Sequence, residues 1–252
     1  MINDRIRAFV SAVLPVEFRH WVRAQQRRLG LQRKPTGGVN LGDLRRLRPI
    51  SRIFGIDRGL PIDRYYIEKF LSAEAKHIQK HVLEIGDNYY TKKFGSNRVT
   101  KSDVLNIVSG DQRTTIVADL TRADSLPSDL FHCIILTQTL QMIYDFRLAL
   151  KHLYRILRPD GVLLLTTHGI SKIGRREGID PWGEYWHFTT QSLKRLFQEF
   201  FPAENVTVKS YGNVLSTIAF LHGLAVEELS TEELDHHDPD YELLITVRAV
   251  KP

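Results

Sequence analysis

Short apolar runs alternate along this chain with stretches whose apolar positions recur every three or four residues. The runs have the length of buried strands, and the periodic stretches have the spacing of amphipathic helices. Strands are predicted at residues 82–85, 98–103, 115–119, 132–136, 162–166, 206–211 and 241–250. Helices are predicted at residues 63–80, 140–157, 190–200 and 213–224, and Asp63 is expected to cap the first of them. This alternation predicts an α/β sandwich with a mainly parallel sheet.

The beginning of the chain follows a different pattern. Apolar positions recur at helical spacing within residues 5–14 and again, opposite several arginines, within residues 18–28. A segment containing glycine and proline, residues 30–42, follows and reads as a linker. We therefore expect a basic helical N-terminal extension with its linker at residues 1–50, and a separate main domain at residues 51–252.

The charge of the chain is concentrated in this extension. The net charge is +6 over 252 residues, yet residues 1–50 hold eleven Lys and Arg against three Asp and Glu, so the main domain is slightly acidic. This distribution predicts no nucleic-acid partner. We expect the extension either to pack on the domain or at a homodimer interface, or to contact an anionic membrane or another partner. A single cysteine, Cys133, and the lack of a signal peptide or long apolar run predict a cytoplasmic protein.

Candidate ligand-binding residues follow the predicted parallel strands, because ligands of such sheets bind beyond the carboxyl ends of the strands. The first strand ends at Gly86, and Asp103 follows it by 17 positions, close to the spacing at which a carboxylate binds the hydroxyls of a ribose. A dinucleotide loop needs three glycines to approach a pyrophosphate, and this loop has one. The pattern therefore favours a nucleoside without phosphates, such as S-adenosylmethionine, over NAD or FAD.

Several sequence blocks resemble the class I S-adenosylmethionine-dependent methyltransferases. These are VLEIG, the acidic end of the second strand, VADL, and FHCIILTQTLQMIYDFRLALKHLYRILRPDGVLLLTT, and the resemblance covers residues 57–252. It implies a Rossmann-like, seven-stranded, mostly parallel sheet flanked by helices. Two further blocks, FGIDRGLPIDRYYIEKFL and GDNYYTKKFG, are similar to methyltransferase domains found beside or fused to glycosyltransferases in bacterial glycan and secondary-metabolite pathways. The implied activity is O-methylation of a sugar, a glycan or a glycosylated small molecule.

The resemblance also implies which residues contact the methionine part of the cofactor. Gly86 and Asp87 would approach it, and Glu84 belongs to the same strand end. Either Tyr65 or Arg64 would reach the methionine carboxylate.

The same resemblance places the rest of the cofactor. Asp103 would bind the ribose, Asp119 the adenine amino group, and the backbone N–H of Leu120 the adenine ring, while Gln138 would lie near the sulfonium. For Asp103 and Asp119 the alternative is a carboxylate that caps a turn at the end of a strand.

Two departures from the family pattern stand out. Residues 87–97 are too few for a full crossover helix, so the first helix is expected to shrink to about one turn, and the cofactor pocket to be more open or to be closed by other elements. Many relatives carry a histidine where this chain has Met142, so no base is expected there.

The catalytic base is sought among histidines near the strand ends, because a hydroxyl must lose its proton as it attacks the methyl group. His168 follows the fifth strand, and His187 lies in GEYWHFTT, which resembles a D-Y-W-R-F-T block of these methyltransferases. The alternative is that both are surface or structural histidines.

Aromatic residues of the segment after the fifth strand are the candidates for binding a sugar ring. They are Trp182, Tyr185 and Trp186, and the alternative is that they anchor the loop. No metal site is expected, because the histidines at 236 and 237 lie in an acidic, solvated loop. Two other functions remain open: a methyltransferase-like interaction module without activity, and a nucleic-acid methyltransferase.

Overall fold

The computed structural model describes residues 15–30, 40–174 and 183–252, and the chain divides into two units, residues 1–47 and 48–252. Each unit is described by itself. The first contains helix α2 (Val16–Arg28) and a short 3₁₀ turn (Gly42–Leu44). The helix predicted within residues 5–14 lies outside the described residues. Among the residues that are described, no helix is both long enough and apolar enough to cross a membrane.

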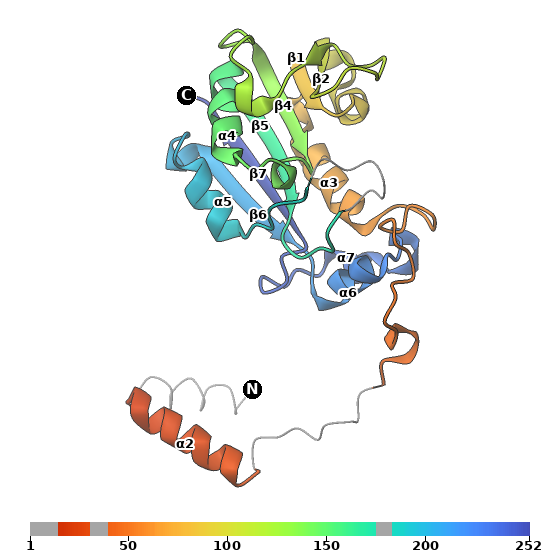
Figure 1. The fold of residues 1–252 in the computed structure, drawn as a ribbon, viewed down its shortest axis with the longest axis vertical. Coiled ribbons are helices and arrows are strands. Elements are labelled where there is room, and N and C mark those ends of the chain that lie inside the picture. Colours follow the sequence, from red (N-terminus) through yellow and green to blue (C-terminus); the bar gives the residue numbers. More distant parts are fainter. Residues whose placement is uncertain (1–14, 31–39, 175–182) are drawn as a thin grey trace. The chain divides into compact units, whose positions relative to one another are not determined.

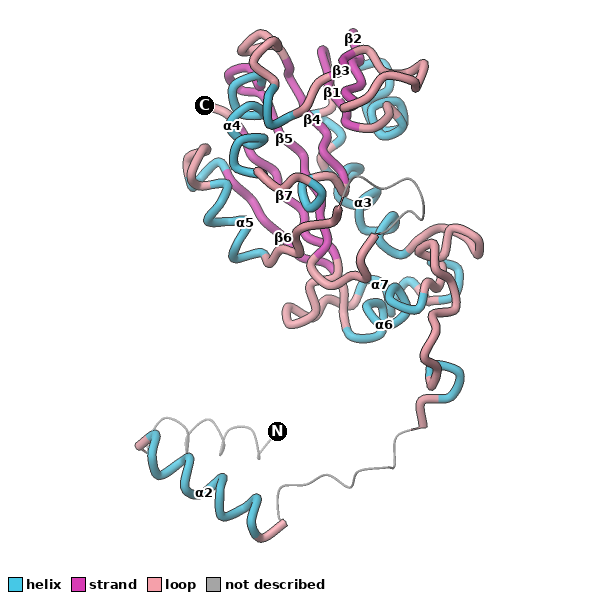
Figure 2. The backbone as a smooth tube through the Cα atoms, in the orientation of Figure 1, coloured by secondary structure: helices cyan, strands magenta, loops and turns pink. Residues whose placement is uncertain are grey.

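The second unit is built on one seven-stranded sheet with the order β3-β2-β1-β4-β5-β7-β6. Its strands are parallel except for β7, which runs antiparallel to both of its neighbours (Figure 1). Figure 2 shows the same strands in magenta and the helices around them in cyan. The predicted fold is thereby confirmed. The strands are β1 (Lys80–Ile85), β2 (Val99–Asn106), β3 (Ile116–Val117), β4 (Phe131–Thr137), β5 (Leu157–His168), β6 (Val206–Tyr211) and β7 (Leu244–Val250).

Helices cover both faces of this sheet and enclose two apolar cores. Alternate residues of a strand point to opposite faces, so Leu83 of β1 belongs to one core and Val82 to the other. One core lies under α4 (Phe146–Ile156) and α5 (Thr190–Phe197). The other contains buried residues of three further helices, which are α3 (Ile62–Ala73), α6 (Val214–His222) and α7 (Thr231–Asp235).

Several predicted boundaries are wrong, and tertiary contacts explain why. Helix α3 begins after Pro61, so Asp63 is its second residue and is buried, not an N-cap. The predicted helix at 140–157 starts only at Phe146, because the carbonyl of Gln141 accepts hydrogen bonds from a distant loop instead of from the next helical turn. Strand β2 continues to Asn106, because its last two residues pair with β3.

The connection between β1 and β2 is shortened, as its length predicts. It contains a five-residue π-helical turn (Thr91–Gly95) and a 3₁₀ turn (Ser96–Arg98) in place of a crossover helix. Gly95 allows this close packing, because a Cβ atom there would lie 2.4 Å from Cγ2 of Val99. This connection therefore supplies no long helix beside the end of β1.

Candidate functional site

The carboxyl ends of β1 and β4 lie side by side at the centre of the sheet. The strand order reverses here, because the chain continues from β1 to β2 on one side and from β4 to β5 on the other. Gly86 follows β1 with a φ of 96°, and no atom lies within 4 Å of the position that a Cβ would take. Gln138 follows β4 with a φ of 48°. These two turns leave space at the position where ligands of such sheets bind.

Glu84 shapes the first of these turns from inside the protein. Its carboxylate accepts hydrogen bonds from the backbone N–H groups of Tyr90, at 3.1 Å, and Thr91, at 2.7 Å. Burial raises the pKa of Glu84 to about 7, although these hydrogen bonds act in the opposite direction. Glu84 therefore holds the loop that carries Gly86, and its oxygens are occupied by that loop.

Arg64 and Tyr65, the two candidates for the methionine carboxylate, point to different parts of the molecule. Arg64 is bonded through Nη1 to the hydroxyl of Tyr90, at 3.0 Å, and so lies beside the loop after β1. The hydroxyl of Tyr65 instead donates to Asp235 of α7, at 2.7 Å. Arg64 therefore lies beside the loop after β1, whereas the hydroxyl of Tyr65 is bonded to α7, and binding of the methionine carboxylate by either residue stays a prediction.

Asp103 does not end its strand, and that prediction is wrong. It pairs with Leu83 in the middle of the sheet, and its carboxylate lies 2.6 Å from Nε2 of His81 and 2.9 Å from the hydroxyl of Thr115. Burial would raise the pKa of Asp103, but His81 and Thr115 more than offset this effect and the pKa is lowered. The basis for assigning Asp103 to the ribose is therefore removed.

Asn106 occupies the strand end that Asp103 was expected to take. Its amide donates to the carbonyl of Gly86, at 3.1 Å, and to the hydroxyl of Thr114, at 2.7 Å. The next residue, Ile107, is 42% exposed. The spacing after Gly86 alone did not reveal Asn106, because the end of β2 depends on its pairing with β3.

Asp119 and Leu120 follow β3, as predicted. Asp119 caps a 3₁₀ turn (Leu120–Arg122) by accepting hydrogen bonds from the backbone N–H and the hydroxyl of Thr121, both at 2.8 Å. One carboxylate oxygen of Asp119 thus caps a turn, as the alternative predicted, and the binding of adenine by Asp119 stays a prediction. Asp87 is half-exposed and accepts a hydrogen bond from the N–H of Tyr89.

Gln141, which sequence reasoning missed, connects the ends of β4 and β5. Its side chain donates to Gln138, at 3.0 Å, and accepts from the hydroxyl of Thr167, at 2.9 Å. Its carbonyl accepts hydrogen bonds from the N–H groups of Tyr185, at 2.9 Å, and Trp186, at 3.2 Å. The amide nitrogen of Gln138 is buried without a partner among the described residues. Gln141 therefore fixes both the turn after β4 and the loop after β5.

His168 lies between two carboxylates at the end of β5. Its Nε2 is 3.7 Å from Asp63 and its Nδ1 is 3.7 Å from Glu184, while Phe54 and Phe220 pack beside the ring. Burial alone would lower the pKa of His168, but the two carboxylates outweigh burial and the pKa is raised. A ring that is 6% exposed and already faces two acids has little access to a substrate hydroxyl.

His187 is better placed to meet a substrate. Its Nε2 lies 3.3 Å from the same Glu184, and its side chain is 31% exposed. The second oxygen of Glu184 accepts a hydrogen bond from the backbone N–H of Gly174. Glu184 thus lies between a buried and an accessible histidine. Like Asn106 and Gln141, it was not predicted as a site residue from the sequence.

Aromatic side chains gather beside these groups. Tyr144 and Tyr185 meet edge to face at 5.4 Å and are 65% and 50% exposed. Trp186 donates from Nε1 to the carbonyl of Tyr144 and packs edge to face against Phe146 at 5.2 Å. Trp186 therefore anchors the loop, whereas the tyrosines are open to a ligand. Trp182 lies outside the described residues.

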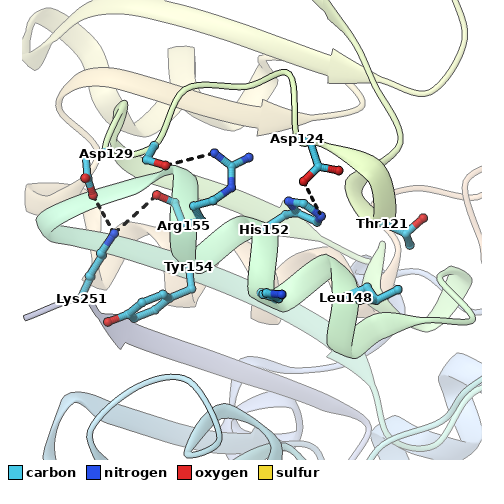
Figure 3. A pocket seen from close by; sticks show the side chains of 10 residues that line it. Thr121, Asp124, Asp129, Leu148, His152, Tyr154, Arg155 and Lys251 are labelled. Atoms are coloured by element: carbon cyan, nitrogen blue, oxygen red, sulfur yellow. Dashed lines mark hydrogen bonds and ion pairs between the residues drawn. The ribbon is translucent and has the colours of Figure 1, made fainter.

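A hollow of about 700 Å³ lies elsewhere, beside α4 (Figure 3). Its polar groups are largely satisfied within the protein: Lys251 bonds to Asp129 at 2.7 Å, and Arg155 donates to two backbone carbonyls. Lys251 and Asp129 lie at the amino ends of the parallel strands, away from the turns at Gly86 and Gln138. In the part of the chain that is described, no group of three or more His, Cys, Asp or Glu residues could hold a metal ion.

Comparisons with solved structures return distantly similar proteins. An S-adenosylmethionine-dependent methyltransferase from Archaeoglobus fulgidus is 12% identical, with a TM-score of 0.48, and the match covers 75% of this chain and 99% of that one. The N-methyltransferase NodS from Bradyrhizobium japonicum, solved with S-adenosylhomocysteine, is 14% identical, with a TM-score of 0.46 and coverage of 77% and 90%. The [4+2]-cyclase SpnF is 14% identical, with a TM-score of 0.49 and coverage of 77% and 84%.

The comparison with family models identifies the family. No curated protein matches the sequence. The family described as "Methyltransferase domain" matches residues 55–204, which is more than half of the chain. The predicted cofactor, S-adenosylmethionine, is confirmed with the family. The chain therefore belongs to the methyltransferase-domain family.

Proposed function

We propose that this methyltransferase transfers a methyl group to a hydroxyl of a sugar, a glycan or a glycosylated small molecule. The observation that carries the proposal is the exposed pair Tyr144 and Tyr185, of which Tyr185 lies two residues before His187 with its accessible imidazole. Aromatic faces bind the apolar faces of sugar rings, and an imidazole is a suitable base for a hydroxyl. The resemblance of the N-terminal blocks to domains associated with glycosyltransferases supports the same substrate class.

The described residues fit the cofactor. Gly86 leaves open space at the strand end, and Arg64 supplies a cation for a carboxylate beside it. Asn106 offers polar atoms in place of the expected Asp103, and exposed Ile107 next to it offers an apolar surface for a base. The unpartnered amide of Gln138 is a further donor at this edge of the sheet. When bound, S-adenosylmethionine supplies an electrophilic methyl group.

The protein then aligns the acceptor and removes its proton. Tyr144 and Tyr185 would hold the ring so that one hydroxyl faces the methyl carbon in line with the leaving sulfur. His187 would take the hydroxyl proton as the new carbon–oxygen bond forms, and Glu184 would stabilise the resulting imidazolium at its distance of 3.3 Å. His168, which is buried beside Glu184, would hold that carboxylate in its charged form.

Transfer of a labelled methyl group tests the proposal. The protein is incubated with S-adenosylmethionine labelled in the methyl group and with methyl glycosides of neutral sugars or of amino sugars. The proposal predicts an O-methylated product whose rate rises with pH as a base is deprotonated, and His187→Gln is expected to lower the rate by about 10²-fold or more. A product methylated only on nitrogen, or a His187→Gln variant with unaltered turnover, would contradict it.

A further inference from the structure

Four ionisable side chains form a row that begins on α3 and ends at the accessible histidine. Oδ2 of Asp63 lies 3.7 Å from Nε2 of His168, and Nδ1 of His168 lies 3.7 Å from Oε1 of Glu184. The same oxygen of Glu184 lies 3.3 Å from Nε2 of His187. Asp63 and His168 are 6% exposed, whereas the side chain of His187 is 31% exposed. Acids and imidazoles therefore alternate from the core to the surface, and we call these four residues the ionisable row.

The inner part of the ionisable row is not a hydrogen-bonded network. A distance of 3.7 Å is too long for a hydrogen bond, and within the described residues neither ring nitrogen of His168 has a hydrogen-bond partner. Oδ1 of Asp63 and Oε1 of Glu184 are likewise buried without one. Buried ionisable groups without hydrogen bonds lower stability, and clusters of such groups are typical of functional sites. These observations favour a functional role for the row over a purely structural one.

The groups around His168 favour its charged form. Asp63 lies in the first turn of α3, where the helix dipole stabilises a negative charge, and the guanidinium of Arg64 adds to this effect. On its other sides the ring of His168 packs beside Phe54 and Phe220, so among the described residues the two acids of the row are the charged groups that face it. Burial would lower the pKa of His168, but these two acids outweigh burial and the pKa is raised.

Glu184 connects His168 to the surface. It faces both histidines of the row and accepts the N–H of Gly174, and Lys172 is a further cation near it. Burial would raise the pKa of Glu184, but His168 and the N–H of Gly174 outweigh burial and the pKa is lowered. Among the described residues, Glu184 is the acid within ion-pair distance of His187. The more of its charge a protonated His168 neutralises, the less strongly Glu184 attracts a proton to His187.

We propose that Asp63 is a positioning residue for methyl transfer that acts on His187 through the two residues between them, an inference that rests on the proposed role of His187 as the base. Asp63 keeps His168 protonated, and the protonated ring offsets part of the charge of Glu184. His187 then stays neutral until the acceptor binds. Because Nε2 of His187 faces Glu184, Nδ1 is the atom left to take the hydroxyl proton, and Glu184 stabilises the imidazolium that forms.

The pH dependence of methyl transfer by Asp63→Asn tests this proposal. Without the charge of Asp63, His168 loses its proton at a lower pH. Glu184 then attracts a proton to His187 more strongly. The acidic limb of the pH–rate profile is expected to move to higher pH by about one pH unit, with turnover restored at high pH and KM for the acceptor within about twofold of the wild type. His168→Gln, which removes the same positive charge directly, should move the limb in the same direction.

Asp124→Asn is the matched control, because Asp124 lies 4.0 Å from Nε2 of another buried histidine, His152, and its replacement makes the same chemical change. Its pH–rate profile should equal that of the wild type. Circular dichroism at each pH checks that every variant is folded. A purely structural role of Asp63 would lower the turnover of Asp63→Asn by the same factor at every pH, and that result would overturn the proposal.

NMR of the histidine rings in the protein without ligands needs no acceptor, so it separates the role of Asp63 from the proposed function. One ring signal, assigned by its loss in His168→Gln, is expected to titrate in the wild type with a pKa above the ordinary 6.5, and Asp63→Asn should lower this pKa. If the signal moves as expected but no hydroxyl acceptor is methylated, the proposed function fails, and the role of Asp63 fails with it. If a hydroxyl is methylated but Asp63→Asn keeps the wild-type titration or pH–rate profile, the role of Asp63 alone is overturned.

Discussion

Glu84 shows how a buried ionisable residue can support a binding loop without facing a ligand. It lies in a strand between two cores, and its oxygens accept the N–H groups of Tyr90 and Thr91. Burial raises its pKa to about 7 from an ordinary value near 4.5. The folded protein thus holds this proton more tightly than the unfolded chain, so the contribution of Glu84 to stability falls as the pH rises from about 4.5 to 7.

Glu84→Gln is expected to reveal this dependence. At pH 5 the variant should be less stable by about 1 kcal/mol, because its amide can accept only one of the two N–H groups. Above pH 7 the deficit should shrink or reverse, because the variant avoids ionising a buried group, a cost of up to roughly 3 kcal/mol. Urea unfolding of both proteins at pH 5 and 7.5 measures the difference, and a deficit independent of pH would contradict this account.

Asp63 and His168 form a second buried pair, whose contribution to stability also falls as the pH rises. The raised pKa of His168 means that its charged form stabilises the fold fully below the unfolded pKa of about 6.5, and that this stabilisation is lost as the pH rises through the folded value. Asp63→Asn should therefore destabilise the protein by about 1–3 kcal/mol at pH 6 and by less at pH 8.5. Unfolding at the two pH values measures this, and an equal loss at both would exclude a charged His168.

At the scale of elements, the strands were easier to predict than their ends. Every predicted strand exists, because its apolar run fills a core, and β6 has the predicted bounds. The end of β2 was not predictable, since two extra residues depend on pairing with β3, and Asn106 instead of Asp103 follows from that. The start of α4 was missed for a similar reason, because the carbonyl of Gln141 bonds to a loop about forty residues later in the sequence.

The loop between β5 and α5 combines an anchor with an open surface, and two variants separate these roles. Trp186→Ala should lower the thermal midpoint by several degrees, because Trp186 packs against Phe146 in the core. Tyr185→Ala should leave the midpoint unchanged and raise KM for the acceptor, whereas Tyr185→Phe should retain most of the affinity through its ring. Thermal melting and acceptor kinetics measure both, and a Tyr185→Ala variant with wild-type KM would remove the tyrosine from the substrate site.

At the scale of the whole molecule, the sequence predicts a methyltransferase domain, and its family and sheet order confirm that prediction. The signal is strong because the alternation of strands and helices, the glycine count and the family blocks agree. The methyl acceptor could not be predicted in this way, since it depends on side chains that only the fold brings together, such as Tyr144 with Tyr185 and His168 with Glu184. The roles of individual cofactor residues depend in the same way on register and hydrogen bonding.

Calorimetric titration of the full chain with S-adenosylhomocysteine measures cofactor binding without any knowledge of the acceptor. We expect one site per chain with a dissociation constant of roughly micromolar. Arg64→Met is expected to weaken binding by about tenfold or more, while Tyr65→Phe, which removes a hydroxyl bonded to Asp235, should bind as the wild type does. Absence of binding by a folded wild-type chain would exclude a cofactor-dependent methyltransferase and favour an interaction module without activity.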